Sequence, residues 1–119
     1  THGFPNLFTI SGPGSPSVLT NMIVSIQQHV NWIMDCLDTM QARQTATIEA
    51  TETASSDWVK AGNAIAAGTL FPTCNSWYLG ANVPGKPRIF MPYVGGFPSY
   101  VEICENVKRE GYPGFVFSN

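Results

Sequence analysis

The spacing of hydrophobic positions predicts three helices, and the longest periodic stretch is the clearest of them. From Leu19 to Met40, apolar residues recur every three or four positions. This period predicts a long amphipathic helix with a broad apolar stripe. Its start is open, because Ser15–Pro16 and Thr20 are both suitable capping positions.

Two further helices are expected after this one. The segment Thr47–Leu70 carries apolar residues roughly on one face and most of its acidic residues early, which predicts a second helix. Pro98 opens a third predicted helix, which runs to about Arg109. Gly111 follows it and is a suitable C-terminal cap.

Short strands and one long loop complete the pattern. The apolar residues of Phe4–Ile10 predict a buried strand. A second short strand is predicted at Arg88–Val94, and because it contains Pro92 we expect it at a sheet edge or with an irregular end. Phe115–Phe117 predicts a small strand. Phe71–Lys86 has no useful period and is rich in glycine, proline and asparagine, so we expect a long irregular loop. Long loops inside compact domains more often have a function than serve only as connections.

Composition narrows the classes of function. Charged residues make up 12% of the 119 residues, well below the roughly 25% of an ordinary domain. We therefore expect other protein to cover part of the surface. The net charge of −2, without a basic cluster, gives no electrostatic support for binding nucleic acid or an anionic membrane. Cys36, Cys74 and Cys104 are widely spaced, so neither a disulfide framework nor a metal site is predicted.

The sequence shows no targeting feature. There is no signal peptide and no run of about 18 apolar residues, so a reducing, cytoplasmic setting is expected. The length fits one domain or a piece of a larger one. Because the chain begins with Thr1 and its first predicted strand follows almost at once, we expect a piece of a longer polypeptide.

The turn before the first helix is nearly a dinucleotide-binding fingerprint. Gly12, Gly14 and Ser17 form G-x-G-x-x-S, which lacks the third glycine. Pro13 and Pro16 remove two N–H donors that a phosphate would need, so a pyrophosphate site is disfavoured. A helix N-terminus remains, and its partial positive charge could stabilise another anion, such as the N1–C2 carbonyl edge of a reduced flavin.

Four long blocks of the sequence resemble a known enzyme family. The blocks are GFPNLFTISGPGSPSVLTNM, SIQQHVNWI, SWYLGANVPGKPRIFMPYVGGFPSY and EGYPGFVFS. In order and separation they are similar to the carboxyl-terminal part of FAD-dependent Baeyer–Villiger monooxygenases of the phenylacetone, steroid and cyclohexanone type. The resemblance implies an α/β fold class for residues 1–119. The segment would be the carboxyl-terminal piece of a FAD-binding Rossmann-like domain, mainly helical with a few short strands.

The resemblance also implies an activity. Members of the family use FAD, NADPH and O2 to oxidise a ketone to an ester or lactone. The family's two Rossmann fingerprints, its F-x-G-x-x-x-H-x-x-x-W signature and its active-site arginine are absent from residues 1–119. We therefore assign no catalytic residue to this segment. We expect it to be inactive alone and to need the remainder of the same enzyme as its partner.

One group of residues is implied to lie at the flavin and the ketone. Ser17, Val18 and Leu19 match a bulge that lines the ketone pocket of the family. Met22 matches a residue that touches both flavin and substrate space, which makes it a candidate FAD contact. Periodicity alone favours the alternative that Val18, Leu19 and Met22 are ordinary core residues of an amphipathic helix.

A second group is implied to lie at NADP and at the far wall of the pocket. Trp77 matches a tryptophan in a mobile control loop, here about residues 71–87, that folds over NADP and donates to its ribose. An indole N–H is a donor, and a loop rich in glycine and proline can open and close. The alternative is a surface loop pinned by a buried tryptophan. Met91, Pro92 and Tyr93 match the far wall of the family's substrate pocket. The alternative is that they are simply the end of a strand in a sheet.

Two other functions stay open. One is a non-catalytic interaction module whose apolar surface docks on a partner protein, which the low charge density supports. The other is a related flavin monooxygenase that oxidises soft heteroatoms, which we expect to lack SWYLGANVPGK. We assign no role to His29, a lone helical histidine, and interpret Trp32 and Trp58 as helix-packing anchors.

Overall fold

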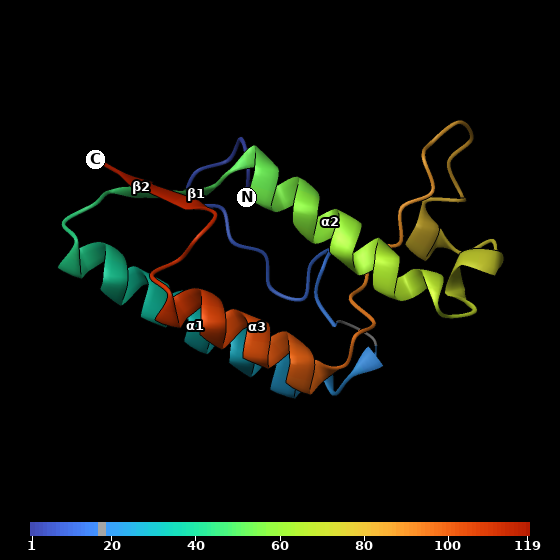
Figure 1. Cartoon of the computed structure of the whole chain (residues 1–119), viewed down its shortest axis with the longest axis horizontal. Helices are drawn as coiled ribbons and strands as arrows, with labels where there is room; N and C mark the ends of the chain where they lie inside the picture. Colours follow the sequence, from blue (N-terminus) through green and yellow to red (C-terminus); the bar gives the residue numbers. More distant parts are fainter. Residues whose placement is uncertain (17–18) are drawn as a thin grey trace.

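The computed structural model describes residues 1–16 and 19–119 and shows two helical layers joined at one end by a small sheet. The elements are α1 (Met22–Ala42), β1 (Thr47–Ala50), α2 (Glu52–Ala67), η2 (Phe71–Thr73), η3 (Trp77–Leu79), α3 (Phe97–Arg109) and β2 (Phe115–Ser118). Helices α1 and α3 lie side by side in one layer and α2 forms the other (Figure 1). The N-terminal segment runs between the layers, and the two short 3₁₀ helices lie at the end opposite the sheet.

The sheet corrects one sequence prediction. Residues 47–50 were expected to begin the second helix, but they form β1, which pairs antiparallel with β2 from Thr47 opposite Ser118 to Ala50 opposite Phe115. The helix α2 starts only after Thr51, whose hydroxyl accepts the Ala54 N–H at 3.2 Å. Residues 47–50 form a strand rather than a helical turn because β2 provides hydrogen-bond partners for the main chain of β1 and the sheet buries Ile48, which is 2% exposed.

The predicted strand at Phe4–Ile10 is wrong, since these residues form turns and irregular backbone. Asn6 has a left-handed backbone with φ of 61°, which asparagine tolerates better than most residues. Its side chain takes the place of a strand partner, because Oδ1 accepts the Ile48 N–H at 2.9 Å and Nδ2 donates to the Ala46 carbonyl at 3.0 Å. The Asn6 N–H also donates to the Ile48 carbonyl at 3.0 Å, and the Gly3 N–H donates to the Glu49 carboxylate at 2.6 Å, so side-chain and main-chain contacts together attach the segment to β1.

The other helix and strand predictions are largely confirmed. Helix α1 begins later than either expected cap, because the Asn21 side chain accepts the N–H groups of Ile23 and Val24. Helix α3 matches its predicted range, and Gly111 follows it with φ of 79°. Strand β2 also forms as expected. The predicted strand at Arg88–Val94 is wrong, because its amides bond to several different elements rather than to one strand.

A buried cluster holds the sheet against α1. Its members are Cys36, Met40, Ile48 and Tyr112, with Trp32 and aromatic residues of β2 packed around them. Burial raises the pKa of the Cys36 thiol, as expected for an inert core cysteine. A second cluster, formed by Ala66, Leu79 and Phe90, joins the end of α2 to η3.

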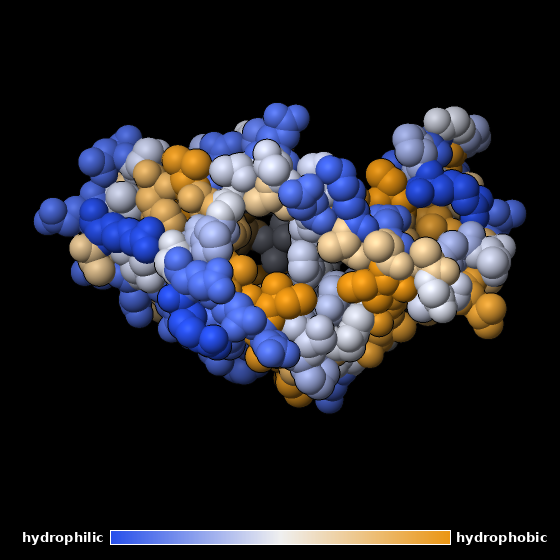
Figure 2. All heavy atoms as spheres, in the orientation of Figure 1, coloured by the Kyte–Doolittle hydropathy of each residue, from blue (hydrophilic) through white to orange (hydrophobic). Residues whose placement is uncertain are grey.

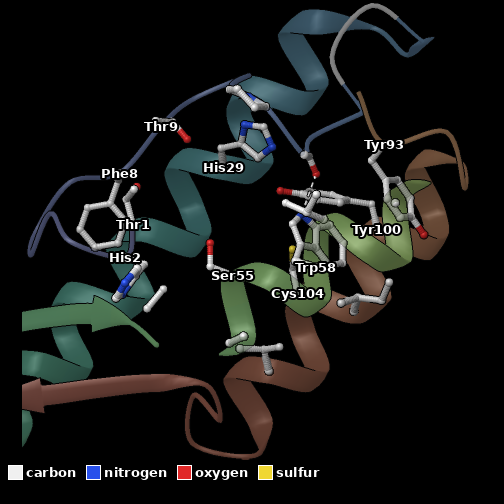
Figure 3. A pocket seen from close by; sticks show the side chains of 18 of the residues that line it. Thr1, His2, Phe8, Thr9, His29, Ser55, Trp58, Tyr93, Tyr100 and Cys104 are labelled. Atoms are coloured by element: carbon white, nitrogen blue, oxygen red, sulfur yellow. Dashed lines mark hydrogen bonds between the residues drawn. The ribbon is translucent and has the colours of Figure 1, made fainter. Parts of the chain in front are cut away.

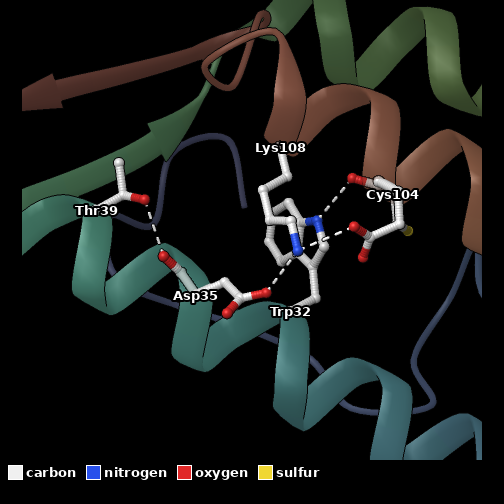
Figure 4. A network of polar contacts seen from close by, with 6 residues as sticks. Trp32, Asp35, Thr39, Cys104 and Lys108 are labelled. Atoms are coloured by element: carbon white, nitrogen blue, oxygen red, sulfur yellow. Dashed lines mark hydrogen bonds and ion pairs between the residues drawn. The ribbon is translucent and has the colours of Figure 1, made fainter.

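Polar contacts tie α1 to α3 (Figure 4). The indole N–H of Trp32 donates to the Cys104 carbonyl at 3.0 Å. The Lys108 ammonium lies between the carboxylates of Asp35, at 2.8 Å, and Glu105, at 2.9 Å. These partly exposed ion pairs add little stability, but with the indole they fix how the two helices lie side by side.

Helix α1 is apolar on a second face as well. Its buried side chains are Ser25, His29, Cys36 and Met40, whereas Ile23 is 78% and Met34 53% exposed. Exposed apolar stripes of this kind usually mark contact with other protein. No helix among the described residues is long and apolar enough to cross a membrane.

Candidate functional site

A cavity of about 630 Å³ lies between α2 and the α1–α3 layer. Figure 2 shows it as a hollow with apolar side chains around it, and Figure 3 shows several of the residues that line it. The lining is mostly apolar and includes Pro13, Trp58, Met91, Pro92 and Tyr100. Such a cavity suits an apolar group with few polar atoms.

The segment Ile89–Tyr93 connects this cavity to three other parts of the chain. The Ile89 and Met91 N–H groups donate to the carbonyls of Leu79, at 3.3 Å, and Tyr78, at 2.9 Å. The Phe90 N–H donates to the side-chain oxygen of Asn63 at 3.0 Å. The Tyr93 N–H donates to the Ser15 carbonyl at 2.8 Å. The segment therefore holds η3, α2 and the glycine-proline turn together, which a strand in a sheet could not do.

This segment joins the predicted far wall of the ketone pocket to the turn that precedes the predicted bulge. The Gly14 N–H donates to the Met91 carbonyl at 2.7 Å, next to the bond between Tyr93 and Ser15. Met91 and Pro92 both line the cavity, and Pro92 is buried. The turn that leads into the predicted bulge thus lies directly against the predicted far wall.

Of the residues predicted at the bulge and the flavin, the structure describes Leu19 and Met22, and neither lines the cavity. Ser17 and Val18 lie outside the described residues. Leu19 is 46% exposed and Met22, the first residue of α1, is 39% exposed. Neither is buried by the described part of the chain, whereas the alternative drawn from periodicity makes both of them core residues. The first turn of α1 holds no acidic residue, so its partial positive charge is not offset there.

Trp77 is exposed at the start of η3. Its side chain is 60% exposed and its ring lies 4.0 Å, centroid to centroid, from that of Tyr78. Among residues 1–16 and 19–119, no hydrogen bond occupies the Trp77 indole N–H. The described residues therefore do not bury Trp77, as the alternative of a loop pinned by a buried tryptophan requires. Leu79, which is 4% exposed, pins this loop instead.

His29 is a residue whose importance the sequence did not reveal. It is 6% exposed, its Nδ1 accepts the Ser11 N–H at 3.0 Å, and its ring meets that of Tyr100 edge-on. Figure 3 shows it at the edge of the cavity. The only sequence signal was its spacing of four residues from Ser25, another buried polar residue of α1.

The His29 contact predicts a pH effect on stability. Burial lowers the pKa of His29 below its ordinary 6.5, because removal from water disfavours the charged ring. The neutral ring is also the form that accepts the Ser11 N–H at Nδ1. Stabilisation is therefore complete above pH 6.5 and is lost as the pH falls below that value, since the unfolded chain takes up the proton first. We expect thermal stability to fall between pH 7 and pH 5 by the order of 1 kcal/mol.

Replacement of His29 separates this effect from general acid sensitivity. His29→Gln keeps an acceptor but no titrating ring, so thermal unfolding of the full-length protein should depend less on pH. His2→Gln is the control, because His2 is an exposed histidine. An unchanged slope in His29→Gln would contradict the assignment.

Comparison with known proteins identifies a family although no protein-family model matches the chain. The acetone monooxygenase (methyl acetate-forming) of Gordonia sp. (strain TY-5) is 38% identical over 118 residues, which are 98% of this chain and 22% of that protein. A Baeyer–Villiger monooxygenase of Pseudooceanicola batsensis is 40% identical over 113 residues, 95% of this chain and 20% of that protein. The phenazine N-monooxygenase PhzNO1 of Lysobacter antibioticus is 35% identical over 116 residues, 98% of this chain and 21% of that protein.

Solved structures agree with the sequence relatives. An oxidised steroid monooxygenase bound to NADP superposes with a TM-score of 0.90 at 44% identity, over 99% of this chain and 21% of that one. The resemblance inferred from the sequence blocks is thus confirmed. The chain spans about one fifth of the length of these relatives. It is homologous to a segment of the Baeyer–Villiger flavin monooxygenases.

Proposed function

We propose that this chain is part of an FAD- and NADPH-dependent enzyme that uses O2 to oxidise ketones to esters or lactones. The observation that carries the proposal is the match, over nearly the whole chain, to an acetone monooxygenase in sequence and to a steroid monooxygenase in fold. Because the chain spans about a fifth of these proteins, the remainder of the same enzyme supplies the other parts of the active site.

The segment would belong to a FAD-binding Rossmann-like domain. Its own architecture is three helices and a two-stranded sheet within the described residues. The exposed apolar stripe of α1, which includes Ile23 and Met34, supports packing against the remainder of the enzyme. This contact also accounts for the low charge content without a separate partner protein.

Met22 and the start of α1 are the proposed flavin contact. When bound, FAD would pass electrons from NADPH to O2. A helix N-terminus with no acidic residue in its first turn fits the anionic edge of a reduced flavin, and the exposed Met22 side chain adds an apolar surface.

Trp77 is the proposed NADP contact. Its exposed indole offers a donor and a flat surface, and neighbouring Gly80, with φ of 68°, lets the chain turn sharply after η3. The hydrogen bond from Met91 to Tyr78 ties this loop to the proposed substrate wall. NADP binding and the pocket would therefore be mechanically connected.

The proposed ketone wall comprises Ser17, Val18, Leu19, Met91 and Pro92. Support comes from Met91 and Pro92, which line an apolar cavity, and from the turn that joins them to the residues before Ser17. An apolar wall would bind the hydrocarbon part of a ketone and exclude water. The described members, Leu19, Met91 and Pro92, carry no acidic or basic group, in keeping with a binding role.

The test is an assay of the purified full-length enzyme. We expect bound flavin, NADPH oxidation that depends on added ketone, and an ester or lactone product identified by mass spectrometry. Acetone and cyclohexanone are suitable first substrates, because relatives are named for them. A protein without flavin, or with no ketone-dependent turnover, would refute the proposal.

Oxidation of a nitrogen atom is a second candidate. The similarity to a phenazine N-monooxygenase is close to that of the ketone-oxidising relatives. The same preparation should therefore be offered a phenazine and an organic sulfide. Turnover of these with none of the ketones would favour heteroatom oxidation.

A further inference from the structure

Trp58 of α2 contacts both segments that form the proposed pocket walls. Its indole Nε1 donates to the Gly14 carbonyl at 3.2 Å. Its ring stacks on that of Tyr93, with centroids 5.4 Å apart and planes 8° from parallel. Figure 3 shows these rings beside Tyr100 at the cavity. One side chain thus bridges the glycine-proline turn and the segment that contains Met91 and Pro92.

The contact between Trp58 and the turn requires a glycine at position 14. Its φ of 81° is a conformation that favours glycine. A Cβ at this position would lie 2.5 Å from the Trp58 Nε1, closer than real atoms approach. The turn and the indole therefore fit only while residue 14 has no side chain.

Tyr93 is held on its other side as well. Its hydroxyl and that of Ser99 are 3.1 Å apart, within hydrogen-bond distance. Its ring is also packed against Gly95, where a Cβ would clash with the phenol, and it meets Tyr100 at a centroid distance of 5.7 Å. Because Tyr93 has little freedom to move, Trp58 can hold the Gly14 turn at a defined distance from it.

We propose that Trp58 is a positioning residue that sets the spacing between the two pocket walls and thereby determines which ketones are accepted. The inference rests on the proposed function. Losing the indole N–H would free the Gly14 carbonyl. The turn would then be held to the Met91–Tyr93 segment by the main-chain hydrogen bonds of Gly14 to Met91 and of Tyr93 to Ser15 with one restraint fewer, so that its position against the segment could shift. Small and bulky ketones would respond differently to that shift.

Trp32 provides a matched control. Like Trp58, it is half-buried, donates its indole N–H to a main-chain carbonyl, here Cys104 at 3.0 Å, and packs on a tyrosine, Tyr112. It lines another part of the same cavity, but its hydrogen bond and ring contact are to Cys104 and Tyr112 rather than to the Gly14 turn or the Met91–Tyr93 segment. Trp32→Phe therefore removes the same kind of hydrogen bond as Trp58→Phe without reaching the proposed walls.

The experiment compares kcat/KM for acetone and cyclohexanone in the full-length enzyme. For Trp58→Phe we expect the ratio of the two values to change by about five-fold. For Trp32→Phe we expect the wild-type ratio. An unchanged ratio in Trp58→Phe, or an equal change in Trp32→Phe, would overturn the inference.

The wild-type assay separates the two proposals. A wild-type enzyme that oxidises ketones while Trp58→Phe keeps its ratio overturns only the role of Trp58. A wild-type enzyme that oxidises no ketone overturns the proposed function, and the inference with it.

A second variant tests the contact even if Trp58→Phe folds poorly. Gly14→Ala places a methyl group against the Trp58 Nε1 and should change the ketone ratio as well. In the double variant, phenylalanine no longer presents a nitrogen at that point. The effect of Gly14→Ala should therefore be smaller in the Trp58→Phe background. Strictly additive effects, or a wild-type ratio in Gly14→Ala, would overturn the inference.

Discussion

Replacing Trp77 by alanine in the full-length enzyme is expected to lower kcat/KM for NADPH by about 100-fold and to release more hydrogen peroxide per NADPH consumed. The substitution removes an exposed indole, which offers both a hydrogen-bond donor and a flat apolar surface. Together these contributions amount to roughly 2–3 kcal/mol, which corresponds to that loss. Weaker binding of NADP would also allow more of the reduced oxygen to leave the active site as hydrogen peroxide before it reacts with the ketone.

Trp77→Phe is the matched control, because it keeps the ring and loses only the N–H. We expect it to fall between wild type and Trp77→Ala in steady-state NADPH kinetics, with peroxide measured in the same samples. Unchanged coupling and NADPH kinetics in Trp77→Ala would remove Trp77 from the proposed cofactor contact. The buried Leu79 beside it keeps the loop attached in both variants.

Tyr112→Ala is expected to cost about 3–5 kcal/mol of unfolding free energy. Tyr112 is 2% exposed and its ring contacts Trp32 of α1 together with Phe115 and Phe117 of β2. Removing the ring leaves a cavity where the sheet meets the helical layer. Thermal unfolding of the full-length enzyme, followed by circular dichroism, should show a lower midpoint.

Tyr112→Phe retains the ring and should unfold close to wild type. The core cluster lies at the sheet end, away from Met91 and Pro92, so folded Tyr112→Ala at low temperature should keep the wild-type preference among ketones. A midpoint equal to that of Tyr112→Phe would show that the ring does not support the core as described.

The local pattern of the chain was enough for those elements that depend on local contacts. The period of α1, the Pro98 and Gly111 signals of α3 and the small strand predicted at Phe115–Phe117 all agree with the structure. The family could also be predicted from the sequence, because the resemblance lies in the order of residues within the four sequence blocks. A helix turn and a cap are formed by residues a few positions apart, so a short stretch of sequence contains all the atoms involved.

Tertiary contacts decided the rest. Ile48 lies in a strand because β2 pairs with its segment, and Asn6 replaces a strand partner through its side chain. His29 is buried because Ser11 and Tyr100 close over it, and Trp58 reaches Gly14 only because α2 crosses the turn. In each case the partner is distant in sequence and carries no periodic signal. These hydrogen bonds and aromatic contacts form only when the layers pack, which is why they appear in the structure and not in the pattern of the chain.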